Sequence, residues 1–188
     1  MLFRSYDRIQ VELAQVPLTT QHAVLAAEDA GFYQHSGFSL SGILRAFWNN
    51  ITTGSSQGGS TITQQYVKTA YLTAEKSYTR KLKELVLSIK LETSDSKDEI
   101  FANYLNTAYF GRGAYGIQAA ARAYFRKDVD QLKISESAML AALLKAPEGF
   151  APEKRLDRLK QRWNYVMDQL VANDWLPAKD RAGMKFPD

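Results

Sequence analysis

Two acidic residues of this sequence stand in patterns that could support acid–base chemistry, and the first is Glu28. It ends an apolar, helix-forming run and is followed at once by Asp29. A carboxylate at such a helix end, facing a cleft, would be partly desolvated and would suit a general base. The alternative is a solvated acidic pair at a helix terminus, which is the commoner situation for such residues. His35 is expected to be a hydrogen-bonded structural histidine.

The second acidic residue, Glu84, is surrounded by positive charge. The segment from residue 68 to residue 92 contains six Lys and Arg residues against three Glu residues. A carboxylate set among cations stays ionised, which is the opposite of the environment expected for Glu28. Such a pair beside a basic patch indicates acid–base chemistry next to a phosphate leaving group. The alternative is a solvated, salt-bridged helix face. The nearby cations are Lys76, Arg80, Lys81 and Lys83.

A third pattern could bind an anion. Two glycines precede a helix that is expected to start at Ser60 or Thr61, and Gln64, Gln65 and Lys68 follow on that helix. The unpaired N–H groups and the positive dipole end of a helix attract anions, and the glycines permit close backbone approach. The alternative is a flexible loop that ends in an ordinary serine cap.

Helices must position all three patterns, because helical periodicity dominates the sequence. The first helix is expected to begin at Thr19 or Thr20, and the glycines at 111, 113 and 116 are expected to form a turn. Leu82, Leu85, Val86 and Ile89 form the predicted buried stripe of the helix over residues 79–92. The other predicted helices cover residues 60–71, 97–106, 117–125, 135–145 (with Ser135 as its cap) and 155–173. With no run of alternating strands, the predicted fold is mostly α.

An apolar helical face lies between the first two patterns. It comprises Leu40, Ile43, Leu44, Phe47, Trp48 and Ile51, and a Gly/Ser-rich loop follows it. Core packing is the common fate of such a stripe. Arg45 and Trp48 at its edge, in a basic protein, also fit a surface that dips into a bilayer.

Composition narrows the class of protein. The 188 residues suffice for one domain with a real core, and the absence of cysteine excludes disulfides, thiol nucleophiles and cysteine-based zinc sites. The net charge of +4 and pI of about 9.2 fit an anionic partner such as phosphate, anionic lipid or nucleic acid. No apolar run approaches the roughly 20 residues that span a bilayer, and no signal peptide is evident.

Taken together, the motifs resemble the peptidoglycan glycosyltransferase domain, glycosyltransferase family 51. The family's first motif is matched by Glu28, Asp29, Phe32, His35 and Gly37. Its second is matched in full over residues 58–65, its third by Arg80, Lys81 and Glu84, and its later ones over residues 104–106, 110–113, 116–121, 138–141 and 146–147. The chain departs from the family pattern at Ser39, Ala102, Arg126, Ala142 and Lys145, and both expected catalytic acids are in place.

The resemblance implies one glycosyltransferase domain over residues 1–188. Its fold would be mostly α, with a lysozyme-like head lobe and a smaller, membrane-facing jaw lobe at roughly residues 38–78. The implied activity is polymerisation of lipid II into β-1,4 glycan strands, with inversion at the anomeric carbon and release of undecaprenyl pyrophosphate.

The resemblance also implies residue roles. Glu28 would be the general base, with Asp29 orienting its neighbours. Glu84 would be the second catalytic acid and would help to hold a divalent metal, Mg or Mn, or the cations at the leaving pyrophosphate. The substrate-binding residues would be Ser60, Gln64, Gln65, Lys68, Lys76, Arg80 and Lys83.

The implied partners are lipid II, the growing glycan chain on its lipid pyrophosphate, and the membrane surface; no nucleic acid is expected. The expected location is the extracytoplasmic face of a bacterial cell membrane, with the anchor outside this sequence. The segment before Trp175 resembles the link to a transpeptidase domain, and the sequence leaves open whether one follows. Two rivals remain: a glycan-cleaving enzyme of lysozyme-like fold, and a non-catalytic module that binds anionic lipid or nucleic acid.

Overall fold

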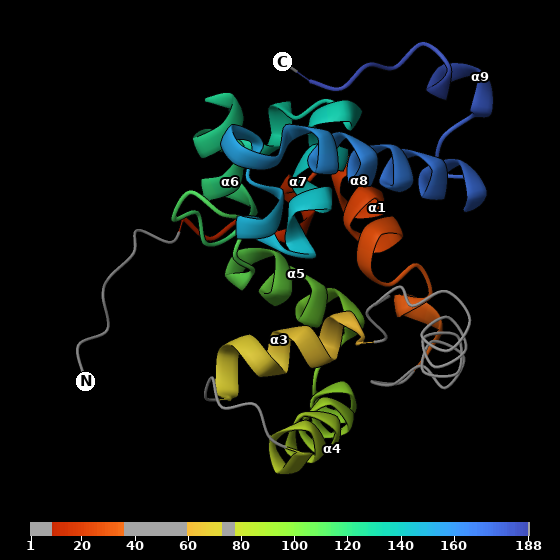
Figure 1. Ribbon diagram of the computed structural model, residues 1–188. Coiled ribbons are helices and arrows are strands. Elements are labelled where there is room, and N and C mark those ends of the chain that lie inside the picture. Colours follow the sequence, from red (N-terminus) through yellow and green to blue (C-terminus); the bar gives the residue numbers. More distant parts are fainter. Residues whose placement is uncertain (1–8, 36–59, 73–77, 188) are drawn as a thin grey trace. The chain divides into compact units, whose positions relative to one another are not determined.

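The computed structural model describes residues 9–35, 60–72 and 78–187 (Figure 1). Within these ranges the regular structure is helical, and the single β feature is an isolated bridge between Tyr109 and Tyr115. The prediction of a mostly α fold is therefore confirmed. The chain divides into unit 1, residues 1–30 and 105–188, and unit 2, residues 31–104, and each is described by itself.

Three helices build the core of unit 1. These are α1 (Leu18–Glu28), α7 (Ile134–Leu144) and α8 (Pro152–Ala172), and each packs against the other two (Figure 1). Both α1 and α7 bury several alanines, and such small side chains allow two helix backbones to approach closely. One polar contact joins the same helices, because the hydroxyl groups of Thr20 and Ser137 lie 2.7 Å apart in the core.

Shorter elements complete unit 1. They are the 3-10 turns η1 (Leu13–Gln15), η3 (Val129–Gln131) and η4 (Pro147–Phe150), and the helices α6 (Ile117–Phe125) and α9 (Ala178–Arg181). The predicted glycine turn before α6 is confirmed, because Gly111, Gly113 and Gly116 all have positive φ angles.

Unit 2 comprises η2 (Phe32–Gln34), α3 (Ile62–Tyr71), α4 (Tyr78–Ser94) and most of α5 (Lys97–Thr107). Helix α3 packs against α4. Phe32, Ile100 and Phe101 are fully buried, and the rings of Phe32 and Phe101 lie 5.8 Å apart. Phe32 of the first motif is therefore a core residue of this unit.

The predicted buried stripe of α4 is wrong. Leu82, Val86 and Ile89 are 63%, 57% and 42% exposed, and Leu85 is half-buried. The helix instead buries a polar edge that includes Glu84 and Ser88, which are 2% and 0% exposed. This orientation is tolerable because cations on the same helix neutralise Glu84, as described below.

Several predicted helix starts also differ from those observed. Thr61 rather than Ser60 caps α3, since its hydroxyl accepts a hydrogen bond from the Gln64 N–H at 3.3 Å. The first helix follows Pro17 instead of a threonine, and α7 follows Lys133 instead of Ser135. At Lys133, the carboxylate of Glu136 accepts the backbone N–H at 2.8 Å, which supplies the cap.

Some predictions fall outside the described residues. The apolar face over residues 40–51, Lys76 and most of the predicted jaw lobe are among them. In the described ranges, no helix combines the length and apolar character that a membrane crossing requires.

Candidate active site

Glu28 is the last residue of α1, as predicted. The five residues before it are all buried, so the helix carries the carboxylate out from the core of unit 1. Asp29 then leaves the helix with φ −162° and ψ 75°, and its N–H donates to the Leu25 carbonyl at 2.8 Å. The side chain of Glu28 is only 10% exposed, so the expected partial desolvation of this carboxylate is present.

Two cations from other helices of unit 1 accompany Glu28. Arg162 of α8 lies with its Nη2 3.7 Å from Glu28 Oε1, and the same nitrogen donates to the Ala27 carbonyl at 2.8 Å. Its guanidinium also lies 4.3 Å from the ring centre of Tyr165. Burial lowers the pKa of Lys145, just past α7, and Arg162 lowers it further while Glu28 raises it. Glu28 therefore stands in a positive environment that its own motif did not predict.

Glu84 is the centre of a cationic cluster in unit 2. Both carboxylate oxygens are occupied: Arg80 Nη1 donates to Oε2 at 3.0 Å, and the Lys81 ammonium group donates to Oε1. Lys81 also donates to the Ser60 hydroxyl at 2.9 Å. We call Ser60, Arg80, Lys81 and Glu84 the cationic cluster.

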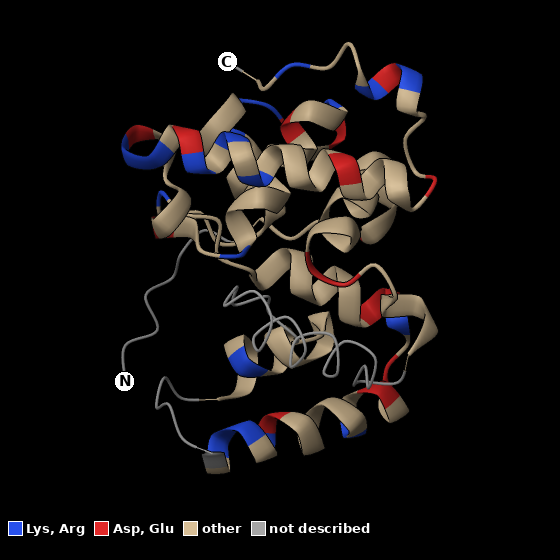
Figure 2. Ribbon diagram, turned by 45° about the vertical axis from the view of Figure 1, so that its right-hand side comes forward, with Lys and Arg blue, Asp and Glu red and all other residues tan. Residues whose placement is uncertain are grey.

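The cationic cluster carries a net positive charge, because one carboxylate faces two cations. Glu84 is almost fully buried, whereas Lys81 is 51% exposed and Arg80 18% exposed. Figure 2 shows Lys and Arg residues gathered at the N-terminal end of α4. The buried anion pairs with two cations near the surface, an arrangement suited to stabilising an anionic group.

Comparison with known proteins identifies the family. Residues 2–171 match the sequence profile of the family described as transglycosylase. The chain belongs to the transglycosylase family. It is 47% identical over 186 residues to penicillin-binding protein 1A of Mycobacterium tuberculosis, covering 97% of this chain and 23% of that protein. It is 40% identical over 175 residues to penicillin-binding protein 1F of Bacillus subtilis, covering 93% of this chain and 24% of that protein.

The fold comparison agrees with the sequence comparison. The crystal structure of penicillin-binding protein 1A from Haemophilus influenzae matches with a TM-score of 0.58 and 25% identity, covering 96% of this chain and 18% of that one. This transglycosylase chain thus spans about a quarter or less of the length of these relatives. The matches confirm the resemblance to the peptidoglycan glycosyltransferase domain and its lysozyme-like helical fold.

The metal predicted at Glu84 of this transglycosylase stays a prediction, and the described residues do not fit it. Mg²⁺ and Mn²⁺ bind oxygen ligands that are free to face the ion. Both oxygens of Glu84 already accept from cations, and the described part of the chain holds no group of three or more His, Asp or Glu residues able to share a metal. No step of the mechanism below passes through a metal.

The predicted sugar- and phosphate-binding residues of the family's second motif have mixed environments. Gln64 is buried, and the amide of Gln65 donates to the Ser60 carbonyl at 3.4 Å while accepting from the Tyr104 hydroxyl at 3.2 Å. These glutamines therefore help to hold the start of α3 in place. Lys68 on α3 and Lys83 on α4 are exposed. Their binding of substrate stays a prediction.

A buried polar bridge anchors the second motif of the transglycosylase to its first. The Thr63 hydroxyl donates to Glu92, and Lys97 Nζ lies 2.8 Å from the other oxygen of Glu92. The same ammonium group lies 4.3 Å from the ring centre of Phe32. Sequence reasoning did not single out Glu92 or Lys97. Charged residues five positions apart on two predicted helices gave no local signal that they would meet.

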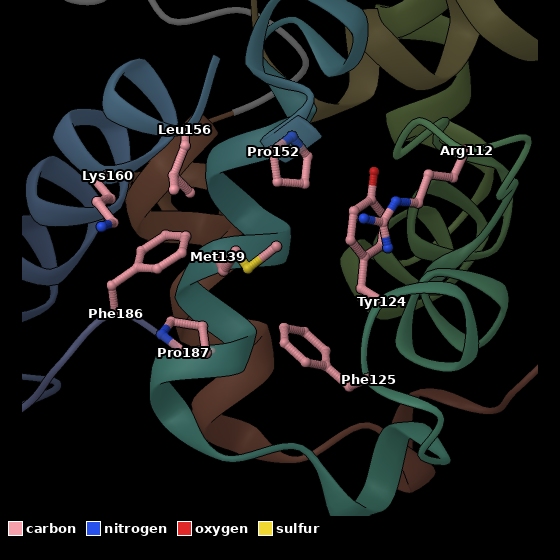
Figure 3. Close-up of a pocket in the computed structure, with 9 residues that line it drawn as sticks. All are labelled: Arg112, Tyr124, Phe125, Met139, Pro152, Leu156, Lys160, Phe186 and Pro187. Carbon is pink, nitrogen blue, oxygen red and sulfur yellow. The ribbon is translucent and has the colours of Figure 1, made fainter. Parts of the chain in front are cut away.

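A separate pocket of about 240 Å³ lies in unit 1, and it contains none of the predicted site residues (Figure 3). Its walls combine apolar and aromatic side chains with two cations. The lining residues are Arg112, Tyr124, Phe125, Met139, Pro152, Leu156, Lys160, Phe186 and Pro187. Phe186 and Pro187 come from the segment beyond the family match, and the Phe186 ring packs edge-on against Trp163 at 5.7 Å.

Proposed function

We propose that this chain polymerises lipid II into β-1,4-linked glycan and releases undecaprenyl pyrophosphate. In this reaction the 4-hydroxyl oxygen of the acceptor sugar attacks the anomeric carbon of the donor. The bond from that carbon to the diphosphate oxygen breaks, and the configuration at the carbon inverts. The hydroxyl proton leaves to a base, and the negative charge that develops collects on the departing diphosphate.

The base in this proposal is Glu28. Its position at the end of α1 fixes the backbone, and the nearly buried side chain limits competition from solvent. The neighbouring Arg162 favours the ionised carboxylate, which is the form that can accept a proton. Asp29 stands at the cap of the same helix and is proposed to orient the groups around the base.

The cationic cluster is the observation that carries the proposal. Departure of a diphosphate needs fixed positive charge, and a preorganised group of donors can lower the barrier by several kcal/mol. Glu84 holds Arg80 and Lys81 at fixed positions, and the exposed Lys81 is available to a ligand. We therefore assign Glu84 an indirect part: it positions the cations, and Lys68, Lys76 and Lys83 add charge around them.

The cationic cluster also separates this proposal from its rivals. Hydrolysis of a neutral glycoside by a glycan-cleaving enzyme produces no diphosphate, so a buried carboxylate that organises two cations would have no part in it. A non-catalytic module that binds lipid or nucleic acid could use the cations, but it would not need the nearly buried carboxylate of Glu28.

The deciding experiment offers the protein both lipid II and finished peptidoglycan in detergent. Polymer formation from lipid II without cleavage of peptidoglycan is the expected result, and Glu28→Gln should abolish it while binding to lipid II persists. Cleavage of the polymer without polymerisation would overturn the proposal. Binding of lipid II by the wild type without polymerisation would assign the chain to the binding-module class, and full activity of the Glu28→Gln variant would exclude Glu28 as the base.

We further propose that the protein works on the extracytoplasmic face of a bacterial cell membrane, with the membrane surface and the growing glycan chain as partners. Its lipid-linked substrate and its likeness to penicillin-binding proteins support this location. The same likeness supports a parent protein with additional parts, since the matched relatives are about four times longer than the aligned segment.

A further inference from the structure

Arg162 makes two contacts that converge on one turn of α1. It donates to the Ala27 carbonyl at 2.8 Å, and the same nitrogen lies 3.7 Å from Glu28 Oε1. We propose that Arg162 is a positioning residue for the base: it fixes the last turn of α1 and keeps the Glu28 carboxylate ionised at neutral pH. This inference rests on the proposed role of Glu28 and assigns to α8 a part in the same reaction.

The surroundings of Arg162 hold it in this place. Its side chain is only 13% exposed, and the guanidinium stacks against Tyr165, which lies about one turn later on α8. A planar guanidinium can stack on a ring and donate in its plane at the same time, which an ammonium group cannot do. The neighbours Trp163 and Val166 are buried in the core of unit 1, so the segment of α8 that carries Arg162 is itself firmly packed.

The effect on Glu28 follows from charge and distance. An opposite charge within about 4–6 Å lowers a carboxyl pKa by roughly 1–3 units, whereas burial alone raises it. Among the described residues of unit 1, the cations shown to act on Glu28 are Arg162 from α8 and Lys145 from the end of α7. The carboxylate of Asp29, the next residue in the chain, acts on Glu28 in the opposite direction to these cations. Arg162 is the better placed of the two cations, since its position is fixed by the Ala27 carbonyl.

The positioning effect is separate from the charge effect. The Ala27 carbonyl belongs to the last turn of α1, where backbone carbonyls lack partners within the helix. Satisfying it from α8 fixes the peptide unit that precedes Glu28. Lysine at position 162 would supply the charge with a single, differently shaped donor group, so it would not restore both contacts together with the stacking.

The test compares the pH dependence of lipid II polymerisation in three forms of the protein: wild type, Arg162→Met and Arg162→Lys. In Arg162→Met, we expect the acidic limb of kcat/KM to move to higher pH by about 1–3 units. In Arg162→Lys, we expect the limb to stay close to that of the wild type and kcat to fall at least tenfold, with KM within about twofold. Arg158→Met is the matched control, because it removes a cation from an exposed site one turn earlier on α8.

The ionisation of the Glu28 carboxyl group can also be measured directly, without an activity assay. The carboxyl ¹³C resonance of Glu28, assigned through Glu28→Gln, should titrate at higher pH in Arg162→Met than in the wild type or Arg158→Met. If Arg162→Met folds but neither the titration of Glu28 nor the acidic limb of kcat/KM moves, the inference is overturned. If Arg162→Met does not fold, a wild-type kcat in Arg162→Lys is sufficient by itself to overturn the inference. Absence of polymerisation by the wild type would instead refute the proposed function.

Discussion

Lys81 joins Ser60 to Glu84. Its ammonium group donates to the Ser60 hydroxyl at 2.9 Å and to the Glu84 carboxylate, so a residue two positions before α3 is tied to the N-terminal part of α4. This contact makes Lys81, which the sequence assigned to the third motif without a role of its own, the exposed cation that Glu84 holds most directly.

Replacing Lys81 should therefore weaken transition-state stabilisation. Lys81→Met removes the exposed charge while keeping much of the side-chain length, and we expect kcat/KM for lipid II to fall about 10²–10³-fold, as for loss of one preorganised donor. Steady-state polymerisation kinetics measure this. Lys90→Met on the same helix is the control, because that lysine is exposed and lies further along α4. Equal losses in the two variants would contradict a specific part for Lys81.

Removal of the Glu84 charge should affect stability as well as activity. In Glu84→Gln the cations Arg80 and Lys81 lose their common anion, and breaking a buried ion pair in this way costs about 3–5 kcal/mol. Arg80 and Lys81 are more exposed than Glu84, so we expect the lower end of that range or somewhat less. Chemical denaturation gives the free energy of unfolding. Asp130→Asn, at an exposed site, should change it by less than about 0.5 kcal/mol. A Glu84→Gln protein as stable as Asp130→Asn would show that the cluster does not depend on its anion.

How far the sequence predicted this site depends on the range of the interactions involved. The end of α1 at Glu28 and the pairing of Arg80 with Glu84 follow from residues within one or two helical turns, and both are confirmed. The prediction of which face of α4 is buried was wrong, because the apolar stripe and the polar edge of this helix have the same helical period. Only the contacts of Glu84 decide which of the two faces inward.

Arg162 shows the other limit of sequence reasoning. It lies in a stretch that the sequence predicts to be a highly charged helix, and its partner Ala27 is 135 positions away in the sequence. No local pattern connects the two. The packing of α8 against α1, which depends on buried side chains of both helices, brings them together. Long-range contacts of this kind are set by tertiary packing and are not encoded in the spacing of neighbouring residues.

The stability of unit 1 should fall in mildly acidic solution because of His22. Its ring stacks on Trp175 at 4.6 Å between centres, and burial lowers its pKa below the ordinary value of 6.5. The unfolded chain therefore binds a proton at higher pH than the native protein does. The stabilising effect is complete above pH 6.5 and is lost as the pH falls below that value toward the lower pKa of the folded state.

Thermal unfolding at pH 7.5 and pH 5.5 measures this contribution. The midpoint temperature of the wild type should fall between the two pH values by more than that of His22→Phe, which keeps an aromatic ring against Trp175 but cannot be protonated. Other groups that titrate in this range are common to both proteins and cancel in the comparison. The same decrease in both proteins would exclude His22 as a source of the pH dependence.

Two glycines of the turn before α6 allow a matched test of backbone geometry. Gly116 has φ +90° and Gly113 has φ +71°, so alanine is strained at either position. The surroundings differ: a Cβ atom at Gly116 would lie 2.8 Å from the Asn106 carbonyl oxygen, whereas one at Gly113 would meet nothing within 4 Å. Asn106 cannot easily move aside, because its side-chain amide makes two hydrogen bonds of 2.9 Å with the backbone of Val11. We expect Gly113→Ala to cost about 1 kcal/mol of unfolding free energy and Gly116→Ala clearly more, about 2–4 kcal/mol. Denaturant unfolding of the two variants side by side decides the matter, and a Gly116→Ala protein no less stable than Gly113→Ala would mean that the backbone at Asn106 yields to the added methyl group.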